Sequence, residues 1–185
     1  MNQLRCHILV DRDKMSITLV INEKDHFGDI IRGTLELSPD FERFGINTGE
    51  YRTTLEMAEF IKMNRAFFEN RSEAMNLVYQ LRKFKAKVDK EVEAEYQPNK
   101  GDKRVLIQQV VDSNIPESFN VLLPLFKGYS KQNIEVETYF NPDDMTCTLV
   151  SPGANESIID FKDEAINEVL EKIKELASEI VIIEQ

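Results

Sequence analysis

Residues 4–21, which read LRCHILVDRDKMSITLVI, decide the fold class of this chain. Apolar residues alternate with other residues on both sides of a polar centre, at Leu4, Cys6, Ile8 and Val10 and again at Ile17, Leu19 and Ile21. Alternation with a period of two is typical of a strand that buries one face. The polar centre, residues 11–14, is typical of a turn. The stretch therefore predicts two antiparallel strands.

The alternation continues after this stretch. A third strand is expected around Ile31, Leu35 and Leu37, which gives a three-stranded meander. Farther along, Phe84 to Val88 alternates with lysine and predicts a strand over residues 83–95. We expect that strand to pair with residues 104–111 across a Pro- and Gly-containing turn.

Three more strands are expected in the second half of the chain, at residues 119–126, 134–140 and 145–149. The first is apolar almost throughout and is expected at the centre of the sheet. Pro124 lies inside it and cannot donate a ladder hydrogen bond, so a bulge or an edge is expected at that point.

Helical patterns separate and follow the strands. Thr53-Thr54-Leu55-Glu56 matches a capping box and predicts a helix from Thr53 to about Asn64. A second helix is expected to begin near Ser72. A third follows Gly153, because apolar residues form one stripe at Ile166, Val169, Leu170, Ile173, Leu176 and Ile180. The apolar tail, residues 181–183, is expected to pack back on the domain or to pair with a neighbouring chain.

These patterns together predict an α+β protein with an antiparallel sheet of about seven to eight strands, two central helices and a C-terminal helix. No low-complexity linker or internal repeat interrupts the chain, so residues 1–185 are expected to form a single domain. Hydrophobic residues make up 42% of the sequence, which is enough to bury a core.

The composition predicts a cytoplasmic protein that does not bind membranes. No apolar run approaches the roughly 20 residues of a membrane-spanning helix, and residues 1–10 lack the layout of a secretory signal. Cys6 and Cys147 are expected to be reduced residues of the core. The net charge of −10 disfavours nucleic acid as a partner of the whole surface.

The charge is nevertheless uneven, and two charged clusters are candidate sites. The basic cluster consists of Arg82, Lys83, Lys85, Lys87 and Lys90. It predicts either contact with a nucleic-acid backbone or a solvated strand face that discourages aggregation. The acidic cluster of the C-terminal helix consists of Glu164, Glu168, Glu171 and Glu175. It is either an ordinary solvated face or a protein-binding surface, which the apolar residues Ile180 and Ile182 would extend.

Catalytic motifs are scarce. There is no glycine-rich phosphate loop, GxSxG elbow or HExxH pair. Pro142-Asp143 followed by Asp160-Phe161-Lys162 matches the arrangement of a metal-dependent nuclease, in which two carboxylates hold Mg²⁺ and a lysine helps to activate water. The competing interpretation is a hairpin turn at Asp143 and a helix N-cap at Asp160 or Asp163.

The remaining titratable pairs have simpler interpretations. Asp11 and Asp13 could hold a cation, but the same residues suit a hairpin corner. His7 is expected to face away from the core, and neither His7 nor His26 has a neighbouring nucleophile in sequence. We therefore predict no catalytic residues, no metal and no cofactor.

Two pairs of segments carry a resemblance to a known family. The first pair is Phe60-Ile61-Lys62-Met63-Asn64-Arg65 with the alternating residues 84–88. The second pair is Ile115-Pro116-Glu117-Ser118-Phe119 with Pro124-Leu125-Phe126-Lys127-Gly128-Tyr129. Their order over residues 15–175 resembles the YfdQ-like family of phage and prophage proteins of unknown function. The resemblance implies a phage or prophage origin and expression in a bacterial cytoplasm, and it implies no active-site residues.

The sequence thus predicts a phage or prophage accessory protein that acts by binding a protein, either a host factor or a second copy of itself. The first alternative is a nucleic-acid-binding protein of phage replication or recombination. The second alternative is a metal-dependent nuclease using Asp143, Asp160 and Lys162.

Overall fold

The computed structural model describes residues 3–22, 24, 28–94, 115–141 and 146–185. Their contacts divide the chain into two compact units. The first unit contains residues 1–38, 126–128 and 155–185, and the second contains residues 39–125 and 129–154. Each unit is described by itself below.

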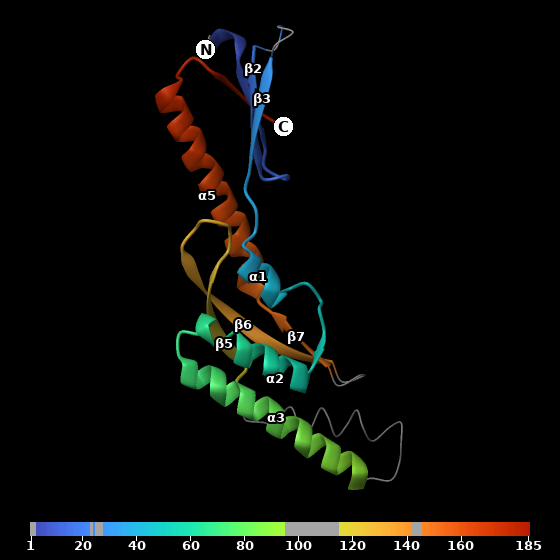
Figure 1. The fold of residues 1–185 in the computed structure, drawn as a ribbon. Coiled ribbons are helices and arrows are strands. Elements are labelled where there is room, and N and C mark those ends of the chain that lie inside the picture. The colour runs from blue at the N-terminus through green and yellow to red at the C-terminus, as the bar shows by residue number, and fades with distance from the viewer. Residues whose placement is uncertain (1–2, 23, 25–27, 95–114, 142–145) are drawn as a thin grey trace. The chain divides into compact units, whose positions relative to one another are not determined.

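The first unit is built on a four-stranded sheet with the strand order β3-β2-β1-β8 (Figure 1). Its strands are β1 (His7–Asp11), β2 (Ser16–Ile21), β3 (Asp29–Thr34) and β8 (Val181–Glu184). The pairs β1–β2 and β2–β3 are antiparallel, which confirms the predicted meander, whereas β8 runs parallel to β1. The register places Ile8 beside both Leu19 and Ile182.

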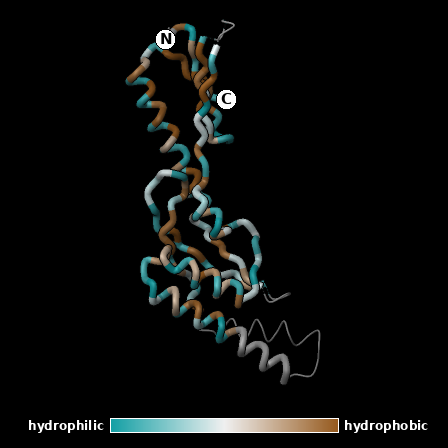
Figure 2. The backbone as a smooth tube through the Cα atoms, in the orientation of Figure 1, coloured by the Kyte–Doolittle hydropathy of each residue, from teal (hydrophilic) through white to brown (hydrophobic). Residues whose placement is uncertain are grey.

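The long helix α5 (Pro152–Leu176) packs against one face of this sheet (Figure 1). Ile8 and Val10 of β1 form a buried cluster with Ile166 and Leu170 of α5. Around this cluster pack the partly buried side chains of Ile17, Leu19, Ile173, Ile180 and Ile182. Hydrophobic residues recur along α5 and along the strands that it covers (Figure 2). The predicted helix is confirmed, and the apolar tail packs back on its own chain as β8.

Two short segments complete the first unit. A 3₁₀ turn, η1 (Gln3–Arg5), precedes β1. Farther along, Leu37 forms an isolated antiparallel bridge with Phe126, and the ring of Phe126 stacks on Phe161 of α5 with centroids 5.8 Å apart. Lys127 forms an ion pair with Glu36 beside this bridge.

The second unit contains another four-stranded sheet, with the order β4-β7-β6-β5. Its strands are β4 (Arg52–Thr53), β5 (Ser118–Pro124), β6 (Lys131–Asn141) and β7 (Thr146–Val150), and all neighbours are antiparallel. The strands expected at 134–140 and 145–149 are therefore confirmed.

The helices of the second unit are α1 (Pro39–Phe44), α2 (Thr54–Met63) and α3 (Arg71–Ala94), with a 3₁₀ turn η2 (Arg65–Phe67) between the last two. The capping box that starts α2 is confirmed. The backbone N–H of Thr53 donates to Glu56 Oε2 at 2.8 Å, and the N–H of Glu56 donates to Thr53 Oγ1 at 3.3 Å. The core of this unit includes Met57, Ile61, Leu77, Leu81, Val121, Val136 and Leu149, all of them buried.

Three expectations about the fold are wrong, although the α+β class is confirmed. The strands form two sheets of four instead of one sheet of seven to eight. The strand predicted over residues 83–95 is helical, because α3 continues to Ala94. Among the described strands, β5 lies at the edge of its sheet and not at the centre, which agrees with the edge expected from Pro124, the final residue of the strand. The expected partner strand at 104–111 lies outside the described residues.

None of the helices that the structure describes is both long and apolar enough to cross a membrane.

Candidate functional site

The sheet of the first unit has a second face, which points away from α5. Because side chains alternate along each strand, this outer face carries the residues that the core does not use. The strand register assembles them into two neighbouring cross-strand rows. One row is Ile30, Val20, His7 and Val181, and the other is Arg32, Thr18, Leu9 and Ile183. No described α-helix of this unit covers the face (Figure 1).

Five of these eight positions are apolar, and we call them the outer patch: Leu9, Val20, Ile30, Val181 and Ile183. Three of the five are substantially exposed, with Ile30 at 69%, Val181 at 59% and Ile183 at 43% of their full accessible surface. A contiguous group of exposed aliphatic side chains on a sheet is typical of an interaction site, whereas isolated exposed apolar residues are common anywhere. The outer patch is therefore the candidate binding surface.

A hollow of about 700 Å³ lies at one end of this face. Its lining consists of Leu4, Arg5, Cys6, His7, Lys24, Val181 and Ile183, so it shares three residues with the two rows. The charged lining residues are Arg5 and Lys24, and none of the described lining residues is acidic. Among the described residues, the lining of the hollow thus carries two cationic side chains and no carboxylate, in a chain with a net charge of −10.

The two ends of the sheet are open edges. Among the described residues, β8 pairs only with β1 and β3 pairs only with β2. An edge strand presents a row of backbone N–H and C=O groups that can pair with another chain. The β8 edge borders the hollow, because Val181 and Ile183 belong to both.

An ion-pair cluster holds β8 in place. Arg12, in the β1–β2 turn, donates two hydrogen bonds to Glu184, and it also donates to Asp163 at 3.2 Å and to Asn167 at 2.8 Å. These hydrogen bonds from Arg12 hold the pKa of the Glu184 carboxyl below its usual value, against a smaller opposing effect of desolvation. The cluster fixes the strand that borders the hollow.

The acidic cluster predicted on the C-terminal helix lies on α5 with all four glutamates exposed. Glu168 forms the expected ion pair with Lys172, at 2.6 Å. Ile180 and Ile182, in contrast, are partly buried and pack against the hydrophobic cluster of β1 and α5. The acidic face and these two isoleucines therefore do not form one surface.

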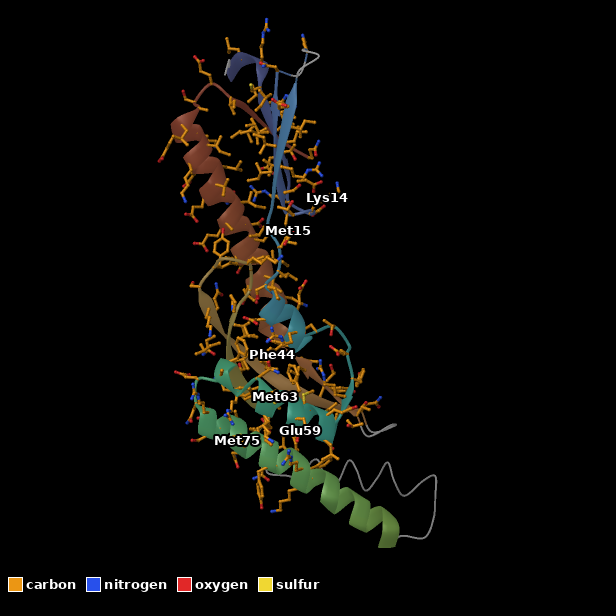
Figure 3. The ribbon with its side chains drawn as sticks, viewed as in Figure 1. Lys14, Met15, Phe44, Glu59, Met63 and Met75 are labelled. Carbon is orange, nitrogen blue, oxygen red and sulfur yellow. The ribbon has the colours of Figure 1, made fainter. Side chains whose placement is uncertain are left out.

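The basic cluster lies on α3, a helix, and so the strand geometry predicted for it is wrong. Arg82 forms an ion pair with Glu59 of α2, and Glu59 is labelled in Figure 3. Lys83 is exposed. Lys85, Lys87 and Lys90 lie farther along the same helix, and their side chains fall outside the described residues. Helical spacing puts positions 83, 87 and 90 on one side of α3 and position 85 on another, so the five residues do not share one face.

The residues of the nuclease alternative are not brought together by what the structure describes. Asp143 lies outside the described residues. Asp160 and Lys162 lie in the third turn of α5, which begins at Pro152, so the prediction that Asp160 or Asp163 caps the helix is wrong. No three acidic, histidine or cysteine side chains gather to hold a metal ion within the described part of the chain.

The other candidate residues of the sequence are accounted for by turn formation or by burial where the structure describes them. Asp11 accepts a hydrogen bond from the Lys14 backbone N–H at 2.9 Å and therefore serves the turn. His7 lies half-buried in the outer face, as expected, and His26 lies outside the described residues. Cys6 and Cys147 are both buried, in different units. Burial raises the pKa of the Cys147 thiol to about 12, against a smaller opposing effect of Arg52.

Sequence reasoning missed the outer patch, although a signal for it was present. Apolar residues stand next to one another at Ile8-Leu9-Val10, Leu19-Val20-Ile21 and Ile30-Ile31. Adjacent apolar residues in a strand point to opposite faces, so both faces of this sheet carry hydrophobic side chains. The alternating set alone forms the core.

No family model, curated protein or solved structure significantly matches this chain. The resemblance to the YfdQ-like family stays a prediction.

Proposed function

We propose that this chain is a non-catalytic binding protein that holds another polypeptide on the outer face of its first unit. The observation that carries the proposal is the outer patch, in which Ile30 on β3 and Val181 and Ile183 on β8 are exposed, with the half-buried Leu9 and Val20 on the strands between them. Burying apolar surface of this kind is the main favourable term in protein association. An accessory protein of a phage or prophage, with a host protein as its partner, is the setting that we propose for it.

The proposal also follows from the construction of the sheet. A four-stranded sheet covered by one helix needs one apolar face for its own core, and α5 packs on that face over β1, β2 and β8. The outer patch contributes nothing to this core. Exposed aliphatic residues on an otherwise charged surface favour aggregation, and a binding role explains their presence better than stability does.

The experiment compares partner capture by three proteins. Ile30→Glu/Val181→Glu alters the outer patch, and Val169→Glu/Leu176→Glu alters two exposed apolar residues of α5 as the matched control. Each protein is immobilised and exposed to bacterial lysate, and light scattering measures its own oligomeric mass. We expect a partner or a second copy that the wild type and the α5 variant retain and the patch variant loses.

Two outcomes would contradict the proposal, provided that circular dichroism shows all three proteins to be folded. Undiminished association of the patch variant would rule out the outer face. Loss of association in the α5 variant alone would instead assign the binding role to the exposed apolar residues of α5.

Nucleic-acid binding through α3 is the second candidate function. Tyr79 is 60% exposed, and Lys83 is exposed four residues later, so an aromatic ring and a cation share one side of this helix. Labelled single-stranded DNA tests the proposal. Binding that weakens steeply with salt and fails in Lys83→Glu/Lys87→Glu would support it, whereas the same affinity in that variant would contradict it.

A further inference from the structure

We infer that the hollow beside β8 takes an extended, acidic and apolar peptide segment of a partner protein, which adds to the sheet as a strand next to β8. This inference rests on the proposed function, and it specifies the edge, the side chains and the chemistry of the partner. Four features of the described residues support it.

The first feature is the backbone of β8. The strand spans Val181–Glu184, pairs with β1 on one side, and has no other described strand on its outer side. An added strand would therefore extend an existing ladder, the mode of peptide recognition in which backbone hydrogen bonds supply affinity and alternate side chains supply specificity.

The second feature is the apolar part of the hollow. Val181 and Ile183 point to the outer face from alternate positions of β8, and Leu4, which is 79% exposed, lines the same hollow. Side chains of an added strand that point to this face would be spaced two residues apart, which matches the spacing of Val181 and Ile183. Alternate apolar residues in the peptide are therefore expected.

The third feature is charge. Arg5 and Lys24 line the hollow, and Arg32 lies in the second row of the outer face. Guanidinium and ammonium groups at the rim of an apolar site favour a ligand that carries carboxylates, and they disfavour a basic one. The chain as a whole carries a net charge of −10, so these cations would favour partners of opposite charge at the hollow.

The fourth feature is the rigidity of β8. Arg12 binds Glu184, and the backbone N–H of Gln185 donates to the carbonyl of Val10 at 2.9 Å, so the strand is held at its C-terminal end. A strand fixed in advance binds with a smaller loss of conformational entropy than a loose tail would.

A second copy of this chain fits the hollow less well. Four of its exposed glutamates lie on the helix α5, which cannot add to a sheet edge, and the exposed Glu135 and Glu137 lie in β6, which already pairs with a strand on each side. Its own β8 carries only one acidic side chain, Glu184, and Arg12 already binds that carboxylate. A partner peptide is therefore the occupant that we propose.

Fluorescence anisotropy with two synthetic peptides tests the inference. The acidic probe is a fluorescein-labelled eight-residue peptide of alternating valine and glutamate, and the basic probe has lysine in place of glutamate. We expect the full-length protein to bind the acidic probe at least about tenfold more tightly than the basic one. Arg5→Glu/Lys24→Glu should abolish this preference, whereas Lys172→Glu/Lys174→Glu, which makes the same charge change at exposed positions of α5, should preserve it.

Amide hydrogen exchange locates the bound probe. Slower exchange in residues 181–184 would support strand addition at β8, and protection confined to β3 would overturn it. Tighter binding to phosphatidylglycerol vesicles than to the acidic probe, or a wild-type dimer that Val181→Glu dissociates, would also overturn it in favour of a membrane or a second copy. If neither probe binds while the outer patch still captures a protein, this inference fails and the proposed function survives. If patch-dependent capture is absent as well, both fail.

Discussion

Arg12 binds both carboxylate oxygens of Glu184, with Nε 3.0 Å from Oε2 and Nη2 3.0 Å from Oε1. The two residues are 172 positions apart in the sequence. Because the same guanidinium reaches Asp163 and Asn167, one side chain joins the β1–β2 turn, α5 and β8. A planar guanidinium with several donors can make all of these bonds at once, which a lysine ammonium cannot do in the same geometry.

Replacing Arg12 is expected to loosen β8. In Arg12→Ala the strand would keep its backbone pairing with β1 but lose the ion pairs at its end. We expect the melting temperature to fall by roughly 2–4 °C, the shift that about 1 kcal/mol produces in a chain of this size. Lys14→Ala removes an exposed ion pair of the same turn and serves as the control, with a smaller effect. Equal melting temperatures of Arg12→Ala and the wild type would contradict a stabilising role for the ion-pair cluster around Arg12.

Acidification is expected to weaken the ion pair between Arg12 and Glu184. The pKa of Glu184 is lowered in the folded protein, so its contribution to stability is fully present above the unfolded value of about 4.5. The contribution is lost as the pH falls through the lower folded pKa. The difference in melting temperature between the wild type and Glu184→Gln should therefore be largest near neutral pH and should disappear on acidification. A difference in melting temperature that grows below pH 4 would contradict the lowered pKa of Glu184 in the folded protein.

The elements that could be predicted from the sequence are those fixed by local chemistry. The capping box at Thr53 and Glu56 lies where it was expected, and so do the meander and the C-terminal helix. Each of these elements is specified by residues that lie close together in the sequence. The division into two sheets depends on which strands meet, and alternation within a strand carries no information about its partner.

The error over residues 83–95 has a physical reason. Phe84 follows Leu81 by three residues and Leu77 by seven, and all three are buried on one side of α3. The alternation from Phe84 to Val88 is only five residues long, and an apolar pattern of that length fits either a strand or one edge of a helix. The helical spacing that begins before Leu77 decides between them, and it continues into α3.

The candidate site was overlooked for a different reason. Leu9 and Val20 appear in the sequence as apolar neighbours of core residues, and nothing local separates the two faces of their strands. Only the register, which aligns them with Ile30 and Ile183, reveals a second apolar surface. The hollow adds Arg5, in the 3₁₀ turn before β1, and Lys24, between β2 and β3, and only the fold brings the two together.

The cap of α2 should be measurable as stability. The Thr53 hydroxyl accepts a hydrogen bond from the backbone N–H of Glu56, and the Glu56 carboxylate accepts one from the backbone N–H of Thr53. Thr53→Ala removes the first of these bonds, so we expect a loss of about 1 kcal/mol in the free energy of unfolding by urea. Asn76→Ala, at an exposed position within α3, is the control and should change stability little. An unchanged unfolding free energy in Thr53→Ala would mean that the cap is dispensable.

The Cys147 thiol is expected to resist modification in the folded protein. It is fully buried in β7, and burial raises its pKa to about 12, so almost none of it is thiolate at pH 8. In Cys6→Ser, where Cys147 is the remaining cysteine, a disulfide reagent such as 5,5′-dithiobis(2-nitrobenzoate) should release no chromophore within minutes at pH 8. The same sample in guanidinium chloride should release one equivalent. Rapid reaction of the folded protein would show that β7 opens to solvent, because only an exposed thiol regains its ordinary acidity.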